Sequence, residues 1–373
     1  MQRKARRRTE EVGLASFVRE NWLNWLLLFI PTSLALEFLG VSKLWIFITS
    51  AMAIVPLAAL IGEATEQLSH RVGHGPGGLL NATFGNATEL IIALLALGAG
   101  LPQVVKASIS GSIIGNVLLV LGASMLVGGW GRDKQEFNRT RAGASAAMLF
   151  LAVVALVMPA VFDLAIFGSL ERRSPAIEDL SLLVALVLLA TYLASLVFSL
   201  KTHRDLLISV PMEPPLARLS LFNSVLLLLV ATAIVAIEAE LLVGSISDVT
   251  TLLGMTEFFV GVVVVAIVGN AAEYFTAVLM ARRNNMELAM IIATGSGTQI
   301  ALFVAPVLVF ASYLAGMPMS LVFNPFEIVG VALAVAAVAI VSLDGESNWF
   351  EGVQLIAIYM VLAIVFYFVP ARA

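Results

Sequence analysis

Apolar stretches of about 20 residues recur along the chain from Asn21 to Pro370, and each is long enough to cross a lipid bilayer as a helix. Hydrophobic residues make up 60% of the 373 residues and charged residues only 12%, whereas a soluble domain has roughly 25% charged residues. Because backbone polar groups must be paired within lipid, stretches of this kind are expected to be helical. The sequence therefore predicts an all-α polytopic membrane protein.

We expect eleven transmembrane helices joined by short connections, with no soluble domain between them. They are placed near 22–40, 44–69, 77–100, 105–129, 142–163, 177–200, 217–244, 256–281, 287–315, 322–343 and 350–369. A single transmembrane transporter domain would then occupy residues 21–373, after a basic tail over residues 1–20. The chain contains no cysteine, which excludes disulfides, thiolate catalysis and Cys-based metal sites.

Positive charge is distributed unevenly between the expected connections. If the N-terminus is cytoplasmic, 16 of the 21 basic residues lie on the cytoplasmic side, and the far side holds only Lys43, Lys106, Arg172, Arg173 and Arg372. Lys and Arg are enriched in cytoplasmic loops. We therefore expect a multi-pass protein with a cytoplasmic N-terminus, located in the cell membrane if the organism is prokaryotic. No short apolar region with a small-residue cleavage site follows Met1–Arg8, so this segment is interpreted as a retained tail and not a signal peptide.

A five-residue pattern occurs twice inside the apolar stretches. Gly85-Asn86-Ala87-Thr88-Glu89 returns in the second half of the chain as Gly269-Asn270-Ala271-Ala272-Glu273. The shift that places Gly85 on Gly269 also aligns Gly111-Ser112 with Gly295-Ser296 without a gap. The two glutamates lie on the third and eighth expected spans, so the two copies would cross the membrane in opposite directions. This predicts one peripheral helix followed by a 5+5 inverted-topology repeat, with the first repeat at about 44–200 and the second at about 217–369. In transporters of this kind the substrate site lies near the midplane, where the repeats meet.

Each copy of the motif places an acid at membrane depth. Moving an ionisable side chain such as Asp or Arg to the centre of a membrane helix costs about 2.5–3.5 kcal/mol on insertion scales. Because the chain accepts this cost twice, we expect Glu89 and Glu273 to be used together. Asn86 and Asn270 lie three residues before these glutamates and would share their helix faces. Two buried carboxylates can be neutralised by one divalent cation or by two protons. Cation and protons would then compete for one site, which is the basis of antiport.

The polar residues around the motifs supply oxygen ligands. Ser112, Ser296 and Gln299 add hydroxyl and amide groups to the two carboxylates and two asparagines. A hard cation such as Ca²⁺ takes 6–8 oxygen ligands, whereas soft metals prefer Cys or Met sulfur. The predicted cation- and proton-binding residues are therefore Glu89, Glu273, Asn86, Asn270, Ser112, Ser296 and Gln299, with Glu89 and Glu273 as the metal ligands.

Structural roles are the alternative for these polar residues. The glutamates could form hydrogen bonds between helices, and the asparagines, serines and Gln299 could join packed helices without touching an ion. Glu66 and Glu240 are expected to lie on the access route of the cation, with solvated interfacial charge as the alternative. The same solvated interpretation is favoured more strongly for Glu63 and Glu238.

At these residues the chain resembles the Ca²⁺/H⁺ exchanger (cation/proton exchanger) family of the calcium:cation antiporter superfamily. The resemblance rests on the two Gly-Asn-Ala-x-Glu motifs and on Gly295–Ile300, and it extends over nearly the whole chain. It implies eleven spans with a peripheral first helix, and exchange of cation and protons at Glu89 and Glu273. It also implies that Glu66 and Glu240 lie toward the cytoplasmic entry or act in proton gating. The Gly-Thr-Ser-x-Pro-Glu/Asp pattern of sodium–calcium exchangers is absent. Many family members carry His after the second glutamate, where this chain has Tyr274.

We therefore expect a proton-coupled Ca²⁺ antiporter, not an enzyme, that moves Ca²⁺ out of the cytoplasm by alternating access. Its substrates would be Ca²⁺ and protons, and it would lie in the lipid bilayer. We expect no cofactor and no nucleic-acid partner, and a homo-oligomer is possible. Competing interpretations are an antiporter for another cation such as Mn²⁺ or Na⁺ and a cation channel. An intramembrane hydrolase would need a metal triad or a catalytic pair at depth, and no such pattern appears in the sequence.

Overall fold

The computed structural model describes residues 22–72, 74–168, 174–202 and 219–370. Two sequence-based expectations concern residues outside these ranges. They are the basic tail over residues 1–20 and the far-side residues Arg172, Arg173 and Arg372.

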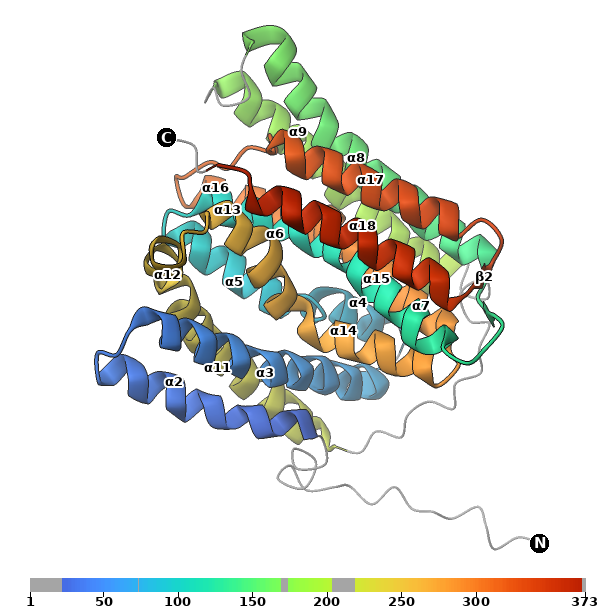
Figure 1. The fold of residues 1–373 in the computed structure, drawn as a ribbon, viewed down its shortest axis with the longest axis horizontal. Coiled ribbons are helices and arrows are strands. Elements are labelled where there is room, and N and C mark those ends of the chain that lie inside the picture. The colour runs from blue at the N-terminus through green and yellow to red at the C-terminus, as the bar shows by residue number, and fades with distance from the viewer. Residues whose placement is uncertain (1–21, 73, 169–173, 203–218, 371–373) are drawn as a thin grey trace, which may run out of the picture.

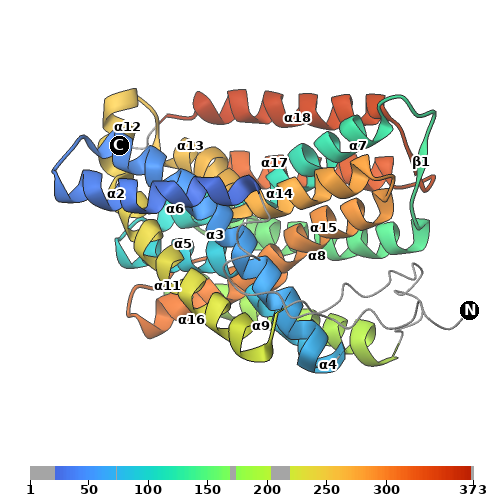
Figure 2. The same cartoon turned by 90° about the horizontal axis from the view of Figure 1, so that it is seen from below.

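The described residues are mostly helical, and the helices form one bundle (Figures 1 and 2). The first part of the chain contains η1 (Trp22–Leu28), α2 (Phe29–Phe38), α3 (Lys43–Val72), α4 (His74–Phe84), α5 (Ala87–Gly98), α6 (Pro102–Ile114), η2 (Gly115–Val120), α7 (Leu121–Gly129), α8 (Arg139–Phe167), α9 (Pro175–Val197) and η3 (Phe198–Thr202). The second part contains α11 (Leu221–Gly244), α12 (Ile246–Leu253), α13 (Glu257–Phe259), η4 (Val260–Val265), α14 (Ala266–Arg282), α15 (Met286–Gln299), η5 (Ile300–Val304), α16 (Ala305–Leu314), α17 (Pro325–Val341) and α18 (Trp349–Tyr367). Two short strands, β1 (Gln135–Glu136) and β2 (Glu346–Ser347), complete the described elements.

Eight of the described helices are long and apolar enough to cross a membrane, judged by length and composition. They are Lys43–Val72, Pro102–Gly129, Arg139–Phe167, Pro175–Thr202, Leu221–Gly244, Glu257–Arg282, Met286–Leu314 and Trp349–Tyr367. Three further apolar helices, Leu23–Phe38, Ala87–Gly98 and Pro325–Val341, are shorter, at 10–17 residues. The prediction of a helical, multi-pass membrane protein is confirmed, while the count of eleven spans stays a prediction.

The helix expected over residues 77–100 is broken in the structure. α4 ends at Phe84 and α5 begins at Ala87, and Asn86 between them has the non-helical dihedrals φ −110° and ψ 27°. Gly lowers helix stability by roughly 0.5–1 kcal/mol relative to Ala, and Asn forms side-chain hydrogen bonds that compete with helix formation. The third expected span therefore consists of two helices, and the break falls at the glycine and asparagine of the motif. α12 is a second difference, because it occupies a stretch expected to be a connection.

Helix boundaries recur at the offset of the repeated motif, which is the shift from Gly85 to Gly269. Under this shift the start of α6 at Pro102 falls on the start of α15 at Met286, and the end of α5 at Gly98 falls on the end of α14 at Arg282. The π-helical segments η2 and η5 also correspond, since positions 116–120 become 300–304. Segments of this kind frequently mark functional sites within longer helices. The two copies differ at the motif, because α14 runs unbroken through Gly269 and Asn270.

The packing brings the two parts of the chain together along several helix pairs. α3 lies along α11, α6 lies against η4, and α7 packs on both α14 and α18. Figure 1 shows α2 on the outside of the bundle, beside α3 and α11.

The short strands connect loops from the two parts of the chain. β1 follows α7 and pairs antiparallel with β2, which precedes α18, in the register Gln135↔Ser347 and Glu136↔Glu346. Lys134 Nζ donates to Glu346 Oε1 at 2.6 Å and also pairs with Glu136 at 3.2 Å. These hydrogen bonds, first to Glu346 and then to Glu136, raise the pKa of the Lys134 amine above its usual value. The pairing therefore ties the two connections together through both backbone and side chains.

Candidate functional site

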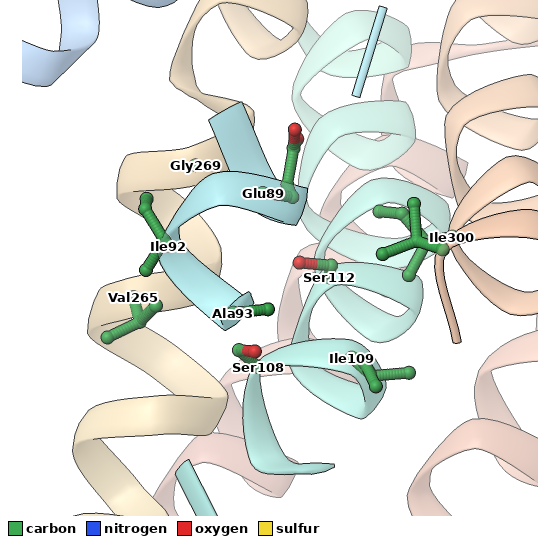
Figure 3. A pocket seen from close by; sticks show the side chains of 10 residues that line it. Glu89, Ile92, Ala93, Ser108, Ile109, Ser112, Val265, Gly269 and Ile300 are labelled. Carbon is green, nitrogen blue, oxygen red and sulfur yellow. The ribbon is translucent and has the colours of Figure 1, made fainter. Parts of the chain in front are cut away.

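Glu89 lies in the first turn of α5, just after the break in the helix. Both of its carboxylate oxygens are buried and have no hydrogen-bond partner among the described residues. Figure 3 shows its side chain at a small pocket, with Ser112 on the neighbouring α6 and Gly269 on α14. A Cβ atom added to Gly269 would lie 3.1 Å from Glu89 Cγ. The glycine of the second motif therefore leaves the space that the acid of the first motif occupies.

Glu273 lies on α14 and is held from α15. Ser296 Oγ donates to Glu273 Oε2 at 2.8 Å, and it also lies 3.4 Å from the Oδ1 atoms of both Asn86 and Asn270. Glu273 is close enough to Glu89 for the two carboxylates to interact electrostatically. Ser296 thus joins the second glutamate to the asparagines of both motifs.

The two motif asparagines are fully buried and hydrogen-bonded across the bundle. Asn86 Nδ2 donates to Gln299 Oε1 at the end of α15. Asn270 Nδ2 donates to Ser112 Oγ and to Ala266 O, each at 2.9 Å. Each asparagine therefore uses its amide hydrogens to fasten a helix of the other part of the chain.

The structure brings seven of the predicted residues into one polar cluster, and these come from α14, α15, α6, α5 and the break before α5. They are Glu89, Glu273, Asn86, Asn270, Ser112, Ser296 and Gln299. Glu66 and Glu240 are not part of it. Both are exposed, and Glu66 lies 3.7 Å from His70 Nε2 on its own helix. Their role in access or gating stays a prediction.

Asn116 belongs to the cluster but was missed by the sequence analysis. It is fully buried in η2, and its Nδ2 donates to Asn270 Oδ1 at 2.6 Å and to Ser296 Oγ at 3.2 Å. The available signal was its spacing of four residues from Ser112, which puts both side chains on one helix face. The repeat concealed it, because the equivalent position in the second copy holds the apolar Ile300.

Tyr274, where many family members have His, points its hydroxyl into the same region. The Oη atom is buried without a hydrogen-bond partner in the described part of the chain. A Cβ atom at Gly115 would overlap with it, so the glycine of η2 accommodates the tyrosine ring. Glu273, Glu89 and Tyr359 all lie within electrostatic range of this hydroxyl.

Replacing Asn116 by Ala should destabilise the protein by about 1–3 kcal/mol, because Asn270 Oδ1 loses its closest donor within a buried cluster. The measurement is thermal unfolding of the purified protein in detergent. Ser124→Ala is the matched control, since Ser124 Oγ is also buried near this helix segment but has no partner among the described residues. Equal melting temperatures for the two variants would contradict the bracing role of Asn116.

The side chains of the cluster offer oxygen atoms, which are the ligands that hard cations prefer. The cluster combines two carboxylates, the side-chain amides of Asn86, Asn270, Asn116 and Gln299, and the hydroxyls of Ser112 and Ser296. Within the described ranges, no group of three or more His, Cys, Asp or Glu side chains forms a metal-binding constellation. Cation binding by Glu89 and Glu273 stays a prediction.

The sequence matches the family model described as sodium/calcium exchanger protein over residues 42–201 and 223–368. The chain belongs to this family.

Several relatives of the chain are named Ca²⁺/H⁺ antiporters. It is 46% identical over 361 residues to the Ca(2+)/H(+) antiporter of Aphanothece halophytica, covering 92% of this chain and 96% of that protein. It is 42% identical over 327 residues to the Ca(2+)/H(+) antiporter ChaA of Bacillus subtilis, covering 86% and 92%. The structure of native YfkE aligns with a TM-score of 0.80 at 38% identity, covering 93% of this chain and 99% of that chain. The Ca²⁺/H⁺ exchanger resemblance is thus confirmed, and the proteins of this group are transporters.

Proposed function

We propose that the chain is a proton-coupled antiporter that moves Ca²⁺ out of the cytoplasm in exchange for protons. The observation that carries this proposal is the pair of buried glutamates, Glu89 and Glu273, of which Glu89 has two carboxylate oxygens without partners in the described structure. The names of the relatives, which are Ca²⁺/H⁺ antiporters at 42–46% identity, support the same substrates.

The two glutamates would hold either one Ca²⁺ or protons. An unpaired carboxylate is costly to bury, so Glu89 needs a cation or a proton to neutralise it in this position. Ca²⁺ would draw on Glu89 and Glu273, with Asn86, Asn270 and the hydroxyls of Ser112 and Ser296 completing an oxygen shell. Protonation of the acids removes their charge and with it the attraction for the ion, so that each substrate displaces the other.

Alternating access would follow from a 5+5 inverted repeat after the peripheral first helix. The common offset between helix boundaries, π-helical segments and motifs supports this organisation. The charge distribution supports a cytoplasmic N-terminus. In this arrangement the site opens to one side of the membrane at a time, and the exposed Glu66 and Glu240 would lie on the access routes.

The test is ⁴⁵Ca²⁺ uptake into proteoliposomes driven by an imposed pH gradient. We expect uptake when the vesicle interior is acidic, and loss of uptake when a protonophore collapses the gradient. Absence of gradient-driven uptake would overturn the proposal. Competition by Mn²⁺ and Na⁺ in the same assay separates this function from antiport of another cation, and uptake that persists without any gradient would identify a channel.

A further inference from the structure

Glu238 is a buried acid outside the candidate site. It lies on α11, six residues before the helix ends at Gly244, or about 9 Å along the axis. Its side chain is fully buried and faces Ser33 of α2, which is also fully buried. Glu238 Oε1 and Ser33 Oγ are 2.8 Å apart. The sequence analysis favoured Glu240 as the functional residue of this pair, but Glu240 is exposed.

The number of hydrogens at this contact indicates the state of the acid. Ser33 Oγ lies 2.8 Å from Ile30 O as well as 2.8 Å from Glu238 Oε1. A hydroxyl carries one hydrogen, and a backbone carbonyl can only accept. If Ser33 donates to Ile30 O, the hydrogen between Ser33 and Glu238 must come from the carboxyl group. Both contacts are therefore full hydrogen bonds only when Glu238 carries a proton.

The surroundings of Glu238 offer little support for an ionised form. Its second oxygen, Oε2, is buried with no hydrogen-bond partner in the described structure. The elements packed against α11 carry these titratable or charged groups: Glu37 on α2; Lys43, Glu63, Glu66, His70 and Arg71 on α3; Glu89 on α5; and Asp248 on α12. Lys43 is paired with Glu37 at 2.9 Å, and Ser33 is the partner that the structure gives to the Glu238 carboxyl. A buried carboxylate with one neutral donor is costly.

Glu238 also lies on the face of α11 that packs into the protein. Ala231, Val235, Glu238 and Leu242 follow the spacing of one helix face, and all four are buried. Ala231 and Val235 belong to the same buried cluster as Ala87, the residue after Asn86. Figure 1 shows α2 on the outer side of α3 and α11. The acid therefore lies where α2 meets α11, and α11 in turn packs against α5, which carries Glu89.

We propose that Glu238 is a second proton-binding site, separate from Glu89 and Glu273, and that its proton fastens α2 to the rest of the protein. With the proton in place, Glu238 donates to Ser33 and Ser33 donates to Ile30. When the proton leaves to solvent, the carboxylate and the Ile30 carbonyl compete for the single Ser33 hydrogen, and the contact between α2 and α11 weakens.

Infrared spectroscopy of the full-length protein in lipid vesicles tests the proton directly. We expect a protonated-carboxyl C=O band at neutral pH that is lost in Glu238→Gln and kept in the matched control Glu240→Gln, which changes an exposed acid on the same helix. Ser33→Ala should shift this band, because it removes the hydrogen-bond acceptor. If Glu238→Gln removes no such band, the proposal is wrong. If that variant does not insert, an unshifted band in Ser33→Ala is equally decisive against it.

Hydrogen exchange of residues 29–38 tests the fastening of α2. Amide hydrogen exchange becomes faster with pH in any protein. Over the pH range in which the carboxyl band disappears, exchange in α2 should accelerate more than this in the wild type, whereas Glu238→Gln should show only the general increase. Identical pH profiles for the two proteins would overturn the link to α2. Neither measurement requires transport, so both can fail or succeed independently of Ca²⁺/H⁺ exchange.

Discussion

Replacing either Glu89 or Glu273 by glutamine should abolish Ca²⁺ uptake driven by a pH gradient. Glutamine keeps the length and one carbonyl oxygen of the side chain, but it removes the negative charge and cannot exchange a proton. Removing one partner from a buried charge interaction costs about 3–5 kcal/mol, which corresponds to a loss of about 100-fold or more in binding. We therefore expect Ca²⁺ binding, measured by calorimetry, to weaken by at least that factor in each variant.

Glu136→Gln is the matched control for these substitutions. It makes the same chemical change on the short strand β1, where the side chain is 74% accessible, and it should leave uptake at the wild-type level. Thermal unfolding distinguishes lost binding from lost folding. Glu273→Gln can still accept from Ser296 through its amide oxygen, so this variant should stay folded. Uptake by a folded Glu89→Gln or Glu273→Gln protein at half the wild-type rate would refute the two-glutamate site.

Gly111→Ala should be strongly destabilising, whereas Gly295→Ala should not. The two glycines are equivalent in the repeat, but a Cβ atom at Gly111 would overlap with the backbone carbonyl oxygen of Val262 on η4. Backbone atoms cannot turn away as a side chain does, so α6 and η4 would have to separate. Overpacking of this kind costs about 1–3 kcal/mol and sometimes more.

The opposite result is expected at Gly295 because a Cβ atom there meets nothing within 4 Å. Alanine is favoured over glycine inside a helix by up to about 1 kcal/mol, so Gly295→Ala should be neutral or slightly stabilising. Thermal unfolding of both variants in detergent is the measurement. Equal shifts in melting temperature would show that the close contact of α6 with η4 does not exist.

The membrane class and the location of the polar cluster were predictable because both depend on patterns that are visible in the sequence itself. Long apolar runs predict helices, and the repeated Gly-Asn-Ala-x-Glu motif pointed to residues that the structure brings together from distant helices. What the repeat could not predict is where its two copies differ. The first copy is broken at Gly85 and Asn86, whereas the second continues through Gly269 and Asn270. Both asparagines bond to other helices, Asn86 to Gln299 and Asn270 to Ser112, so the local motif does not reveal which copy is broken.

Asn116 and Glu238 are buried polar residues that a comparison of the two repeats could not find. Each is a buried polar residue whose counterpart in the other copy, Ile300 or Ile54, is apolar. A search for matching polar residues passes over both. Choosing between Glu238 and Glu240 also required knowledge of which face of α11 packs inward, and a helix that is apolar on nearly all sides does not reveal this. α12 was missed because eight residues between two long apolar runs resemble a connection.

The β1–β2 pairing has a mechanical meaning for any motion of the bundle. It ties the end of α7 to the start of α18, two helices that also pack along each other. We expect this end of the molecule to behave as a rigid block, and the largest relative displacements to occur at helix pairs far from the strands. A small rotation of the helices about the strands would then produce larger atomic displacements at the opposite end of the helices.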